Sequence, residues 1–226
     1  MQIKSFILLV AISTLFVTVS HAQPRNYEIK NGFYIGGGIT QFDIMSDNFE
    51  TNSSSGFLVS MGIGADLPHK WYNISYNIQI AENKFELSGR MTDDVAGDEA
   101  LEYKVFTAQL GLVFHVKLIG AYLTLDLGPQ LQYNGDLELT DDSQESYFIN
   151  NYVSLQASDI KEITNFNVNA LGGLTASFGA FKLRGQYIYG LTNMLNKLND
   201  QDLTTGNNSS FKGNQGMMTL AAFFVF

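Results

Sequence analysis

The chain has 226 residues, of which 45% are apolar and 13% aromatic, with 21 glycines, 3 prolines and no cysteine. A disordered chain would contain fewer aromatic residues and a disulfide scaffold would need cysteines, so both classes are excluded. Thirteen Lys and Arg stand against 22 Asp and Glu, which gives a formal net charge of −9. Such a chain repels phosphate backbones, and we therefore expect no nucleic-acid partner.

The first 22 residues are typical of a secretory signal peptide. A lysine near the start is followed by an apolar core over residues 6–19 and by a small-x-small cleavage site that ends at Ala22. This core is shorter than the about 20 apolar residues that a transmembrane helix needs. We expect cleavage near Ala22, a short periplasmic segment over residues 23–31 and a folded domain over residues 32–226.

Apolar and polar residues alternate over eight segments of the remaining chain, which predicts eight β-strands. The clearest case is residues 121–136, where Leu125 and Leu127 alternate with Thr124 and Asp126. The eight segments are residues 32–42, 57–67, 71–81, 102–115, 121–136, 165–178, 181–191 and 216–226. Their lengths suit the about 9–11 residues of a tilted strand that crosses a membrane.

Long and short connections alternate along the chain. The tight turns are residues 68–70, 116–120 and 179–180, and the long polar connections are residues 43–56, 82–101, 137–164 and 192–215. An up-and-down meander places all long connections at one end, as transmembrane barrels do with their extracellular loops. We predict an all-β fold, a transmembrane antiparallel up-and-down β-barrel of eight strands with long extracellular loops and short periplasmic turns. Two further segments, residues 84–89 and 147–156, fit either extensions of the strands or an extra hairpin.

Alternation alone does not say which row of side chains faces outward, because a soluble lipocalin-like barrel buries its apolar row. The polar row is rich in Asn, Gln, Ser, Thr and Gly and poor in charge, which suits a narrow packed lumen. Phe224 and Phe226 end the chain in a way similar to the C-terminal signal that the barrel-assembly machinery recognises. Aromatic residues near strand ends favour interfacial girdles: Trp71, Tyr72, Tyr103, Tyr122, Tyr133, Tyr187 and Tyr189. These features favour the outer membrane.

Residues 165–193 resemble the C-terminal half of the PorT-like outer-membrane β-barrel family. The shared pattern is a Gly-rich strand, a tight turn and a strand that ends in Tyr-x-Tyr-Gly-Leu-Thr-Asn. This ending corresponds to Tyr187, Tyr189, Gly190, Leu191, Thr192 and Asn193. Gln186 stands where the family often has Arg, and Arg184 lies two residues earlier on the same face. The resemblance implies an outer-membrane barrel with an architecture like that of OmpX and OmpA and, through the family's namesake, a link to protein secretion.

The placement of histidine speaks against an enzyme. Known outer-membrane barrel enzymes resemble one another in using His to activate Ser or water at the extracellular rim. His21 belongs to the predicted signal peptide, and His69 and His115 fall at the short-turn end. We therefore expect no catalytic residue, no metal site and no cofactor.

Three charged residues are candidates for an ion-pair system inside the lumen. Asp126 lies in mid-strand on the polar face, and Lys182 and Arg184 lie on the polar face of another strand. One interpretation is a structural plug in which buried charges pair, and the other is a narrow channel or small-ligand site. Because an eight-stranded interior is just wide enough for side chains to fill, we favour the plug.

Acidic residues concentrate in the second and third long connections: Asp93, Asp94, Asp98, Glu99, Glu102, Asp136, Glu138, Asp141, Asp142 and Glu145. Their spacing matches no defined calcium loop. We expect a non-enzymatic outer-membrane protein with a structural or surface-interaction role through these loops. Expected partners are outer-membrane lipids and lipopolysaccharide and the barrel-assembly machinery. If the chain is instead an accessory component of a secretion or surface-assembly system, subunits of that system are partners too.

Overall fold

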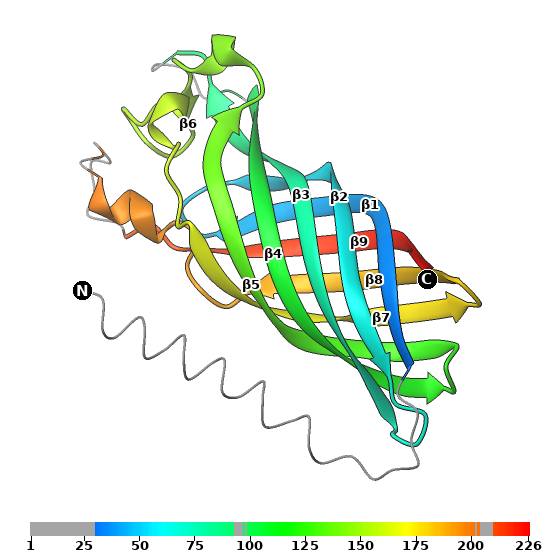
Figure 1. The fold of residues 1–226 in the computed structure, drawn as a ribbon. Coiled ribbons are helices and arrows are strands. Elements are labelled where there is room, and N and C mark those ends of the chain that lie inside the picture. The colour runs from blue at the N-terminus through cyan, green and yellow to red at the C-terminus, as the bar shows by residue number, and fades with distance from the viewer. Residues whose placement is uncertain (1–29, 93–96, 98, 202, 204–209) are drawn as a thin grey trace, which may run out of the picture.

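Eight long antiparallel strands form one closed barrel in the computed structural model, which describes residues 30–92, 97, 99–201, 203 and 210–226 (Figure 1). The strands are β1 (Lys30–Ser46), β2 (Thr51–Asp66), β3 (Tyr72–Arg90), β4 (Glu99–Ile119), β5 (Leu123–Leu139), β7 (Phe166–Phe178), β8 (Phe181–Gly190) and β9 (Gly213–Val225). Each pairs with the next in chain order, and β9 closes the ring against β1. The predicted antiparallel up-and-down barrel is thus confirmed. The predicted signal peptide, residues 1–22, and residues 23–29 lie outside the described residues.

The strands reach further than expected on the side of the long connections. β1 and β2 are separated only by residues 47–50, and β3 runs through residues 84–89. The prediction that residues 43–56 and 82–101 are long loops is therefore wrong for most of their length. Residues 147–156 hold a separate short strand, β6 (Phe148–Ile149), which pairs with the end of β3.

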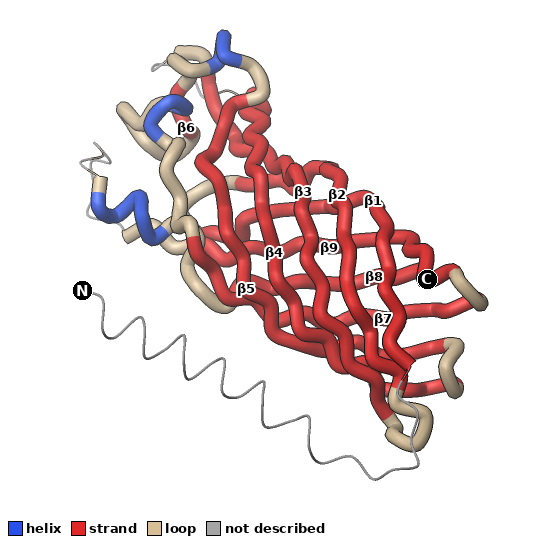
Figure 2. Tube along the Cα trace, in the orientation of Figure 1, coloured by secondary structure: helices blue, strands red, loops and turns tan. Residues whose placement is uncertain are grey.

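Two connections remain long, residues 140–165 and 191–212. They carry short 3-10 helices: η2 (Asp142–Gln144), η3 (Ala157–Asp159) and η4 (Asn196–Asp200). Figure 2 shows that these helices lie at one end of the barrel, the loop end, while tight turns join the strands at the other, the turn end. Within the described residues, no helix is long and apolar enough to cross a membrane.

The tight turn between β4 and β5 lies later in the chain than predicted. β4 continues to Ile119, and the Tyr122 amide donates a hydrogen bond to the Ile119 carbonyl at 3.0 Å. Gly120 has a φ of 54°, in the left-handed region that glycine enters without a Cβ penalty. The prediction of a turn over residues 116–120 is therefore wrong. The true turn sets the register in which His115 lies opposite Asp126.

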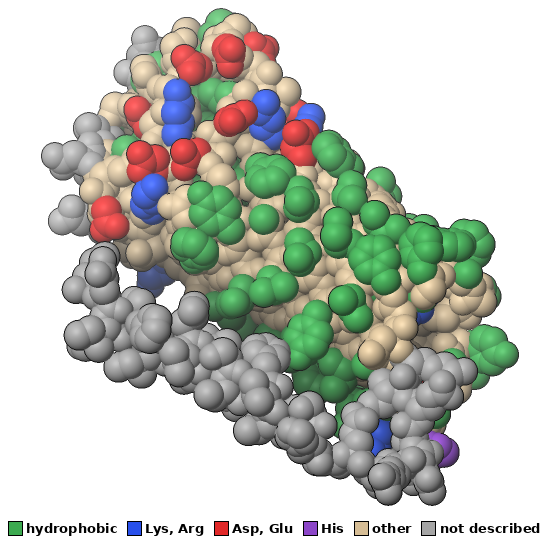
Figure 3. Space-filling model, in the orientation of Figure 1, with side chains coloured by type: hydrophobic (Ala, Val, Ile, Leu, Met, Phe, Trp, Pro, Cys, Tyr) green, Lys and Arg blue, Asp and Glu red, His purple; other side chains and the backbone are tan. Residues whose placement is uncertain are grey.

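Apolar side chains cover the outside of all eight barrel strands. On β5, Leu127 and Leu131 are exposed, whereas Thr124, Asp126 and Gln132 are buried inside. We call the outward apolar side chains the apolar belt (Figure 3): Phe33, Ile35, Ile39, Phe57, Val59, Met61, Ile63, Tyr76, Ile78, Ile80, Phe106, Leu110, Phe114, Leu118, Leu127, Leu131, Tyr133, Phe166, Val168, Leu174, Phe178, Phe181, Leu183, Tyr187, Tyr189, Met218, Leu220 and Phe224. A lipocalin-like barrel has the opposite arrangement, so that alternative is wrong.

Toward the loop end, the polarity of the two faces of the strands is reversed: the outward row becomes charged and the inward row becomes apolar. On β3 the outward row passes from Ile80 to Glu82 and Lys84, while the inward row passes from Gln79 to Phe85. The outward charges pair across neighbouring strands, because Lys84 Nζ lies 2.9 Å from Glu102 Oε1. The loop end is therefore built like a water-soluble protein, with an apolar core and a charged surface.

The long connections fold over this end and complete its core. We call residues 140–165 and 191–201 the cap. Arg90 at the end of β3 donates hydrogen bonds to the carbonyls of Ile149 at 2.9 Å and Tyr152 at 2.6 Å. Tyr103 is buried here and donates to the Ala157 carbonyl at 2.9 Å, so its predicted place in an outer aromatic girdle is wrong. The core includes Phe42, Ile44, Phe49, Phe85, Leu87, Leu101, Val105, Leu137, Ile149, Leu155, Ile160, Ile163, Met194, Leu195, Leu198 and Phe211.

A layer of amide side chains crosses the middle of the lumen. Gln79 donates to Gln109 at 2.7 Å, Gln109 donates to Gln132 at 2.6 Å, and Gln132 donates to Gln215 at 2.5 Å. These four buried residues come from β3, β4, β5 and β9, so the chain of hydrogen bonds joins opposite walls of the barrel. The layer separates the apolar core at the loop end from a pocket at the turn end.

Candidate functional site in the turn-end pocket

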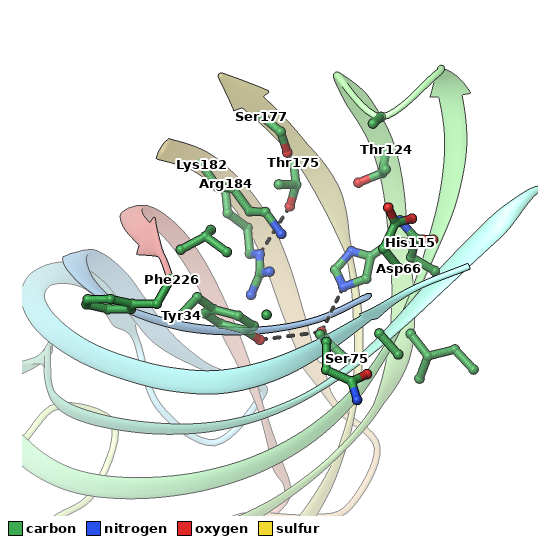
Figure 4. Close-up of a pocket in the computed structure, with 18 of the residues that line it drawn as sticks. Tyr34, Asp66, Ser75, His115, Thr124, Thr175, Ser177, Lys182, Arg184 and Phe226 are labelled. Atoms are coloured by element: carbon green, nitrogen blue, oxygen red, sulfur yellow. Dashed lines mark hydrogen bonds between the residues drawn. The ribbon is translucent and has the colours of Figure 1, made fainter. Parts of the chain in front are cut away.

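A pocket of about 430 Å³ occupies the turn end of the lumen (Figure 4). Its charged lining residues are Asp66, His115, Lys182 and Arg184. They come from β2, β4 and β8 and project inward because each strand alternates between its outer and inner face. The pocket therefore gathers most of the charge of the lumen in one place.

Asp126 lies behind the pocket wall and is fully buried. Its Oδ1 accepts a hydrogen bond from Thr124 Oγ1 at 2.9 Å and lies 2.6 Å from His115 Nδ1. Its Oδ2 accepts from Thr175 Oγ1 and lies 3.6 Å from Arg184 Nε. The structure thus brings together Asp126 and Arg184, two of the three lumen residues singled out from the sequence.

Lys182, the third, does not join that ion pair. It lies two residues before Arg184 on the same face of β8, closer to the turn, and its Nζ lies 5.8 Å from the centre of the Tyr34 ring. The Arg184 guanidinium lies 5.3 Å from the same ring and 4.8 Å from that of Phe223. Figure 4 shows both cations reaching into the space in front of Tyr34.

Ser75 and His115 are site residues that the sequence reasoning missed. Ser75 Oγ lies 2.7 Å from His115 Nε2, and the Tyr34 hydroxyl donates to Ser75 Oγ at 3.4 Å. The misplaced turn after β4 hid the relation of His115 to Asp126. A hairpin centred on Gly120, the glycine that marks the turn, places these two residues directly opposite each other.

Ser75, His115 and Asp126 are connected in the order of a nucleophile, a base and an orienting carboxylate. Acyl transfer also needs donors for the developing oxyanion, usually backbone N–H groups that are free to point at the substrate. Ser75 is paired on both sides, with Gly64 and Val113, so its backbone amide belongs to the sheet. The Ser75 amide is therefore not available as an oxyanion donor, and the arrangement can orient polar groups toward a ligand.

The residues of the predicted family motif anchor the end of β8. Thr192 Oγ1 accepts hydrogen bonds from Asn167 Nδ2 at 2.8 Å and from the Val168 amide at 3.1 Å. Asn193 Oδ1 accepts from the amides of Leu195 at 3.1 Å and Gly213 at 2.8 Å. Tyr187, Tyr189 and Leu191 face outward, and Gly190 is buried against β9. In this chain the motif joins β7, β8 and β9 where the cap begins.

Phe224 and Phe226, proposed from the sequence as an assembly signal, lie at the turn end. The ring of Phe224 packs against those of Phe181 at 5.3 Å and Phe226 at 4.9 Å. The Phe226 amide donates to the Phe33 carbonyl at 2.8 Å. The final residues thus help to close the ring of strands, and their role in assembly stays a prediction.

The acidic residues of the loop end are partly neutralised. Glu138 pairs with Lys104 at 3.1 Å and Glu145 with Lys161 at 3.2 Å. Hydrogen bonds from Ser143 hold the pKa of the Asp141 carboxyl below its usual value. Asp93, Asp94 and Asp98 lie outside the described residues. Among the residues that the structure describes, no group of three His, Cys, Asp or Glu side chains could hold a metal ion.

The comparisons with known proteins found matches among solved structures and none among family models or curated sequences. No family model and no curated protein sequence matches the chain, so the PorT-like resemblance is not confirmed. Among solved structures, Neisserial surface protein A shares 12% identity over 86% of this chain and 97% of its own, with a TM-score of 0.49. Ail, the attachment invasion locus protein of Yersinia pestis, shares 11% identity over 87% of this chain and 99% of its own, with a TM-score of 0.46. At these values neither function nor partner carries over to this chain.

Proposed function

We propose that this chain is a non-enzymatic β-barrel of the cell outer membrane that holds a folded acidic cap at the cell surface for contact with other molecules. The observation that carries the proposal is the exchange of polarity along the strands. The apolar belt suits hydrocarbon on the outside, whereas the loop end, with its charged exterior and apolar core, suits water.

The apolar belt supports the membrane assignment. Soluble monomers rarely expose apolar patches larger than a few hundred Å², and the belt extends over all eight barrel strands. A closed ring leaves no unpaired strand edge, which is the condition for crossing hydrocarbon with β-structure. The predicted signal peptide fits export to an outer membrane. In this proposal membrane lipids and lipopolysaccharide cover the belt.

The filled lumen supports a surface role over a channel. The apolar core lies under the cap, and the amide layer crosses the middle of the barrel. Both consist of close-packed side chains, which leave no room for the continuous water column of a pore. We expect the barrel to act as a rigid support for its cap.

The cap supports recognition of a basic partner. The cap contains six acidic side chains and two lysines, most of them in the segment 140–165: Asp141, Asp142, Glu145, Asp159, Glu162, Asp200, Lys161 and Lys197. Arg90 and Tyr103 fix this segment to the barrel wall, so its surface is ordered before a partner arrives. Preorganised loops on a rigid scaffold lower the entropy cost of binding.

Labelling of single cysteines on intact cells tests the surface position of the cap. The chain has no cysteine, so Val153→Cys in the cap and Lys70→Cys in a tight turn each introduce one thiol. Val153 is 72% exposed, and Lys70 is exposed at the opposite end. A membrane-impermeant maleimide should label the Val153→Cys variant on intact cells and the Lys70→Cys variant only after the outer membrane is permeabilised. Labelling in the reverse order would overturn the proposed orientation.

A further inference from the structure

We propose that the turn-end pocket binds a small organic anion, a phosphate or a carboxylate, between Lys182 and Arg184 on one side and Ser75 and His115 on the other. This site is separate from the cap and does not depend on its role. The proposal rests on the charge balance of the pocket, on donors without acceptors and on the shape of the cavity.

Positive charge exceeds negative charge at the pocket surface. Of the charged groups that line the cavity, Asp66 is paired with Lys117, whose Nζ lies 3.5 Å from Asp66 Oδ1 and donates to the Leu67 carbonyl at 2.9 Å. Asp126 is fully buried behind the wall and not among the lining residues. Lys182 therefore faces the cavity outside any ion pair within 4 Å among the described residues, and Arg184 contacts Asp126 through Nε alone, which leaves its two terminal nitrogens toward the cavity.

Asp126 also has no capacity left for these cations. Its two oxygens already contact Thr124, His115, Thr175 and Arg184 Nε. Among the described residues, neither Lys182 Nζ nor the two terminal nitrogens of Arg184 has a hydrogen-bond acceptor. These donors face the cavity, and an oxyanion bound there would accept hydrogen bonds from several of them at once.

Arg184 is held ready for such a ligand. Its side chain is buried, Nε is fixed by a 3.1 Å hydrogen bond to Thr175 Oγ1, and the guanidinium packs on the rings of Tyr34 and Phe223. Fixing one edge of the guanidinium leaves its planar fork of donors for a carboxylate or phosphate. Little side-chain entropy remains to be lost on binding.

The rest of the cavity favours an organic anion over a bare ion. Ser75, His115 and Tyr34 supply polar atoms opposite the cations, and Ile74, Val225 and Phe226 supply apolar wall. A volume of about 430 Å³ falls within the range of small-molecule sites. Because the amide layer lies beyond the pocket, a ligand that enters from the turn end is held there.

Calorimetric titration of the full mature chain, folded in a non-ionic maltoside micelle, tests the proposal. The probes are phenyl phosphate, benzoate and the neutral benzamide, and a phosphocholine detergent is avoided because its headgroup would compete. Both anions should bind and benzamide should not. Lys182→Gln should weaken phenyl phosphate binding by about tenfold or more, the value of one charged hydrogen bond, and Lys182→Arg should restore it.

Lys161→Gln is the matched control, because it removes the same charge from a half-exposed site at the loop end. It should leave the affinity unchanged. The proposal is overturned if neither anion binds at ~10 mM, because a dissociation constant above this concentration is weaker than that of a specific enclosed site. Equal losses in Lys182→Gln and Lys161→Gln would also overturn it, since they would show an effect of net charge rather than of this pocket.

Discussion

Replacing Leu127 by arginine is expected to reduce the free energy of unfolding by about 2–4 kcal/mol, the cost of a cation on the lipid face near the middle of a bilayer. Leu127 is 47% exposed in the apolar belt. It lies opposite Phe114 on β4 and Gly172 on β7, midway in sequence between Tyr122, which precedes β5, and Tyr133 on β5. Urea titration in phospholipid vesicles, with the folded fraction read from the gel mobility of unboiled samples, measures the change.

Val153→Arg is the control for the Leu127 substitution. Val153 is 72% exposed, more than Leu127, but it belongs to the cap. In water an added surface arginine changes stability by less than about 0.5 kcal/mol. The explanation by a lipid-facing belt fails if the two substitutions cost the same.

Asp126→Asn is expected to cost about 3–5 kcal/mol, because it leaves Arg184 buried without its counter-charge. Asp126 is fully buried and Arg184 is 3% exposed, so water in the pocket replaces the lost carboxylate only in part. Asn keeps nearly the same volume, which excludes a cavity as the cause. The same urea titration measures the loss.

Two further variants identify the source of this loss. Asp66→Asn removes a carboxylate whose side chain is 45% exposed and whose contact with Lys117 is 3.5 Å long, so we expect a cost below about 1 kcal/mol. Arg184→Gln combined with Asp126→Asn removes both buried charges and should recover at least about 1 kcal/mol of the loss. Equal costs for Asp126→Asn and Asp66→Asn, or no recovery in the double variant, would refute a structural ion pair.

The barrel itself was predictable from the sequence because apolar and polar residues alternate with a period of two in every strand. The leucines of β5 and the isoleucines of β3 mark the outward face without help from tertiary structure. The alternation of long and short connections, which is also visible in the sequence alone, predicted the up-and-down order of the strands. The orientation of the two faces followed from the low charge of the polar row, which suits a lumen.

The strand ends at the loop end were harder to predict, because the hydrophobic pattern changes phase there. On β3 the apolar positions are even-numbered up to Ile80 and odd-numbered from Phe85 onward. A search for one continuous period ends the strand at this change, whereas the backbone continues to Arg90. The change of phase marks the edge of the apolar belt. A search that allows the apolar positions to switch from even-numbered to odd-numbered residues would detect it.

The candidate site was only half predictable, because a lumen site depends on register. Asp126 and Arg184 were recognisable as charges on polar faces. Their relation to His115 and Ser75 depends on which residues form the turn after β4, and an error of a few residues there moves every pair along the hairpin. Gly120, with its positive φ, was the local signal for the correct turn.

Tryptophan fluorescence in vesicles of brominated phospholipids tests the membrane-spanning barrel most directly, because bromine quenches only tryptophans that lie close to it. The chain has a single tryptophan, Trp71, which lies at the turn end and is 68% exposed. The double variant Trp71→Phe/Leu127→Trp moves the single fluorophore to the middle of the apolar belt. We predict strong quenching of the variant by lipids brominated near the middle of the bilayer and weaker quenching of the native protein, whose tryptophan lies at the interface. The absence of quenching at position 127, with free access to a water-soluble quencher, would contradict the account.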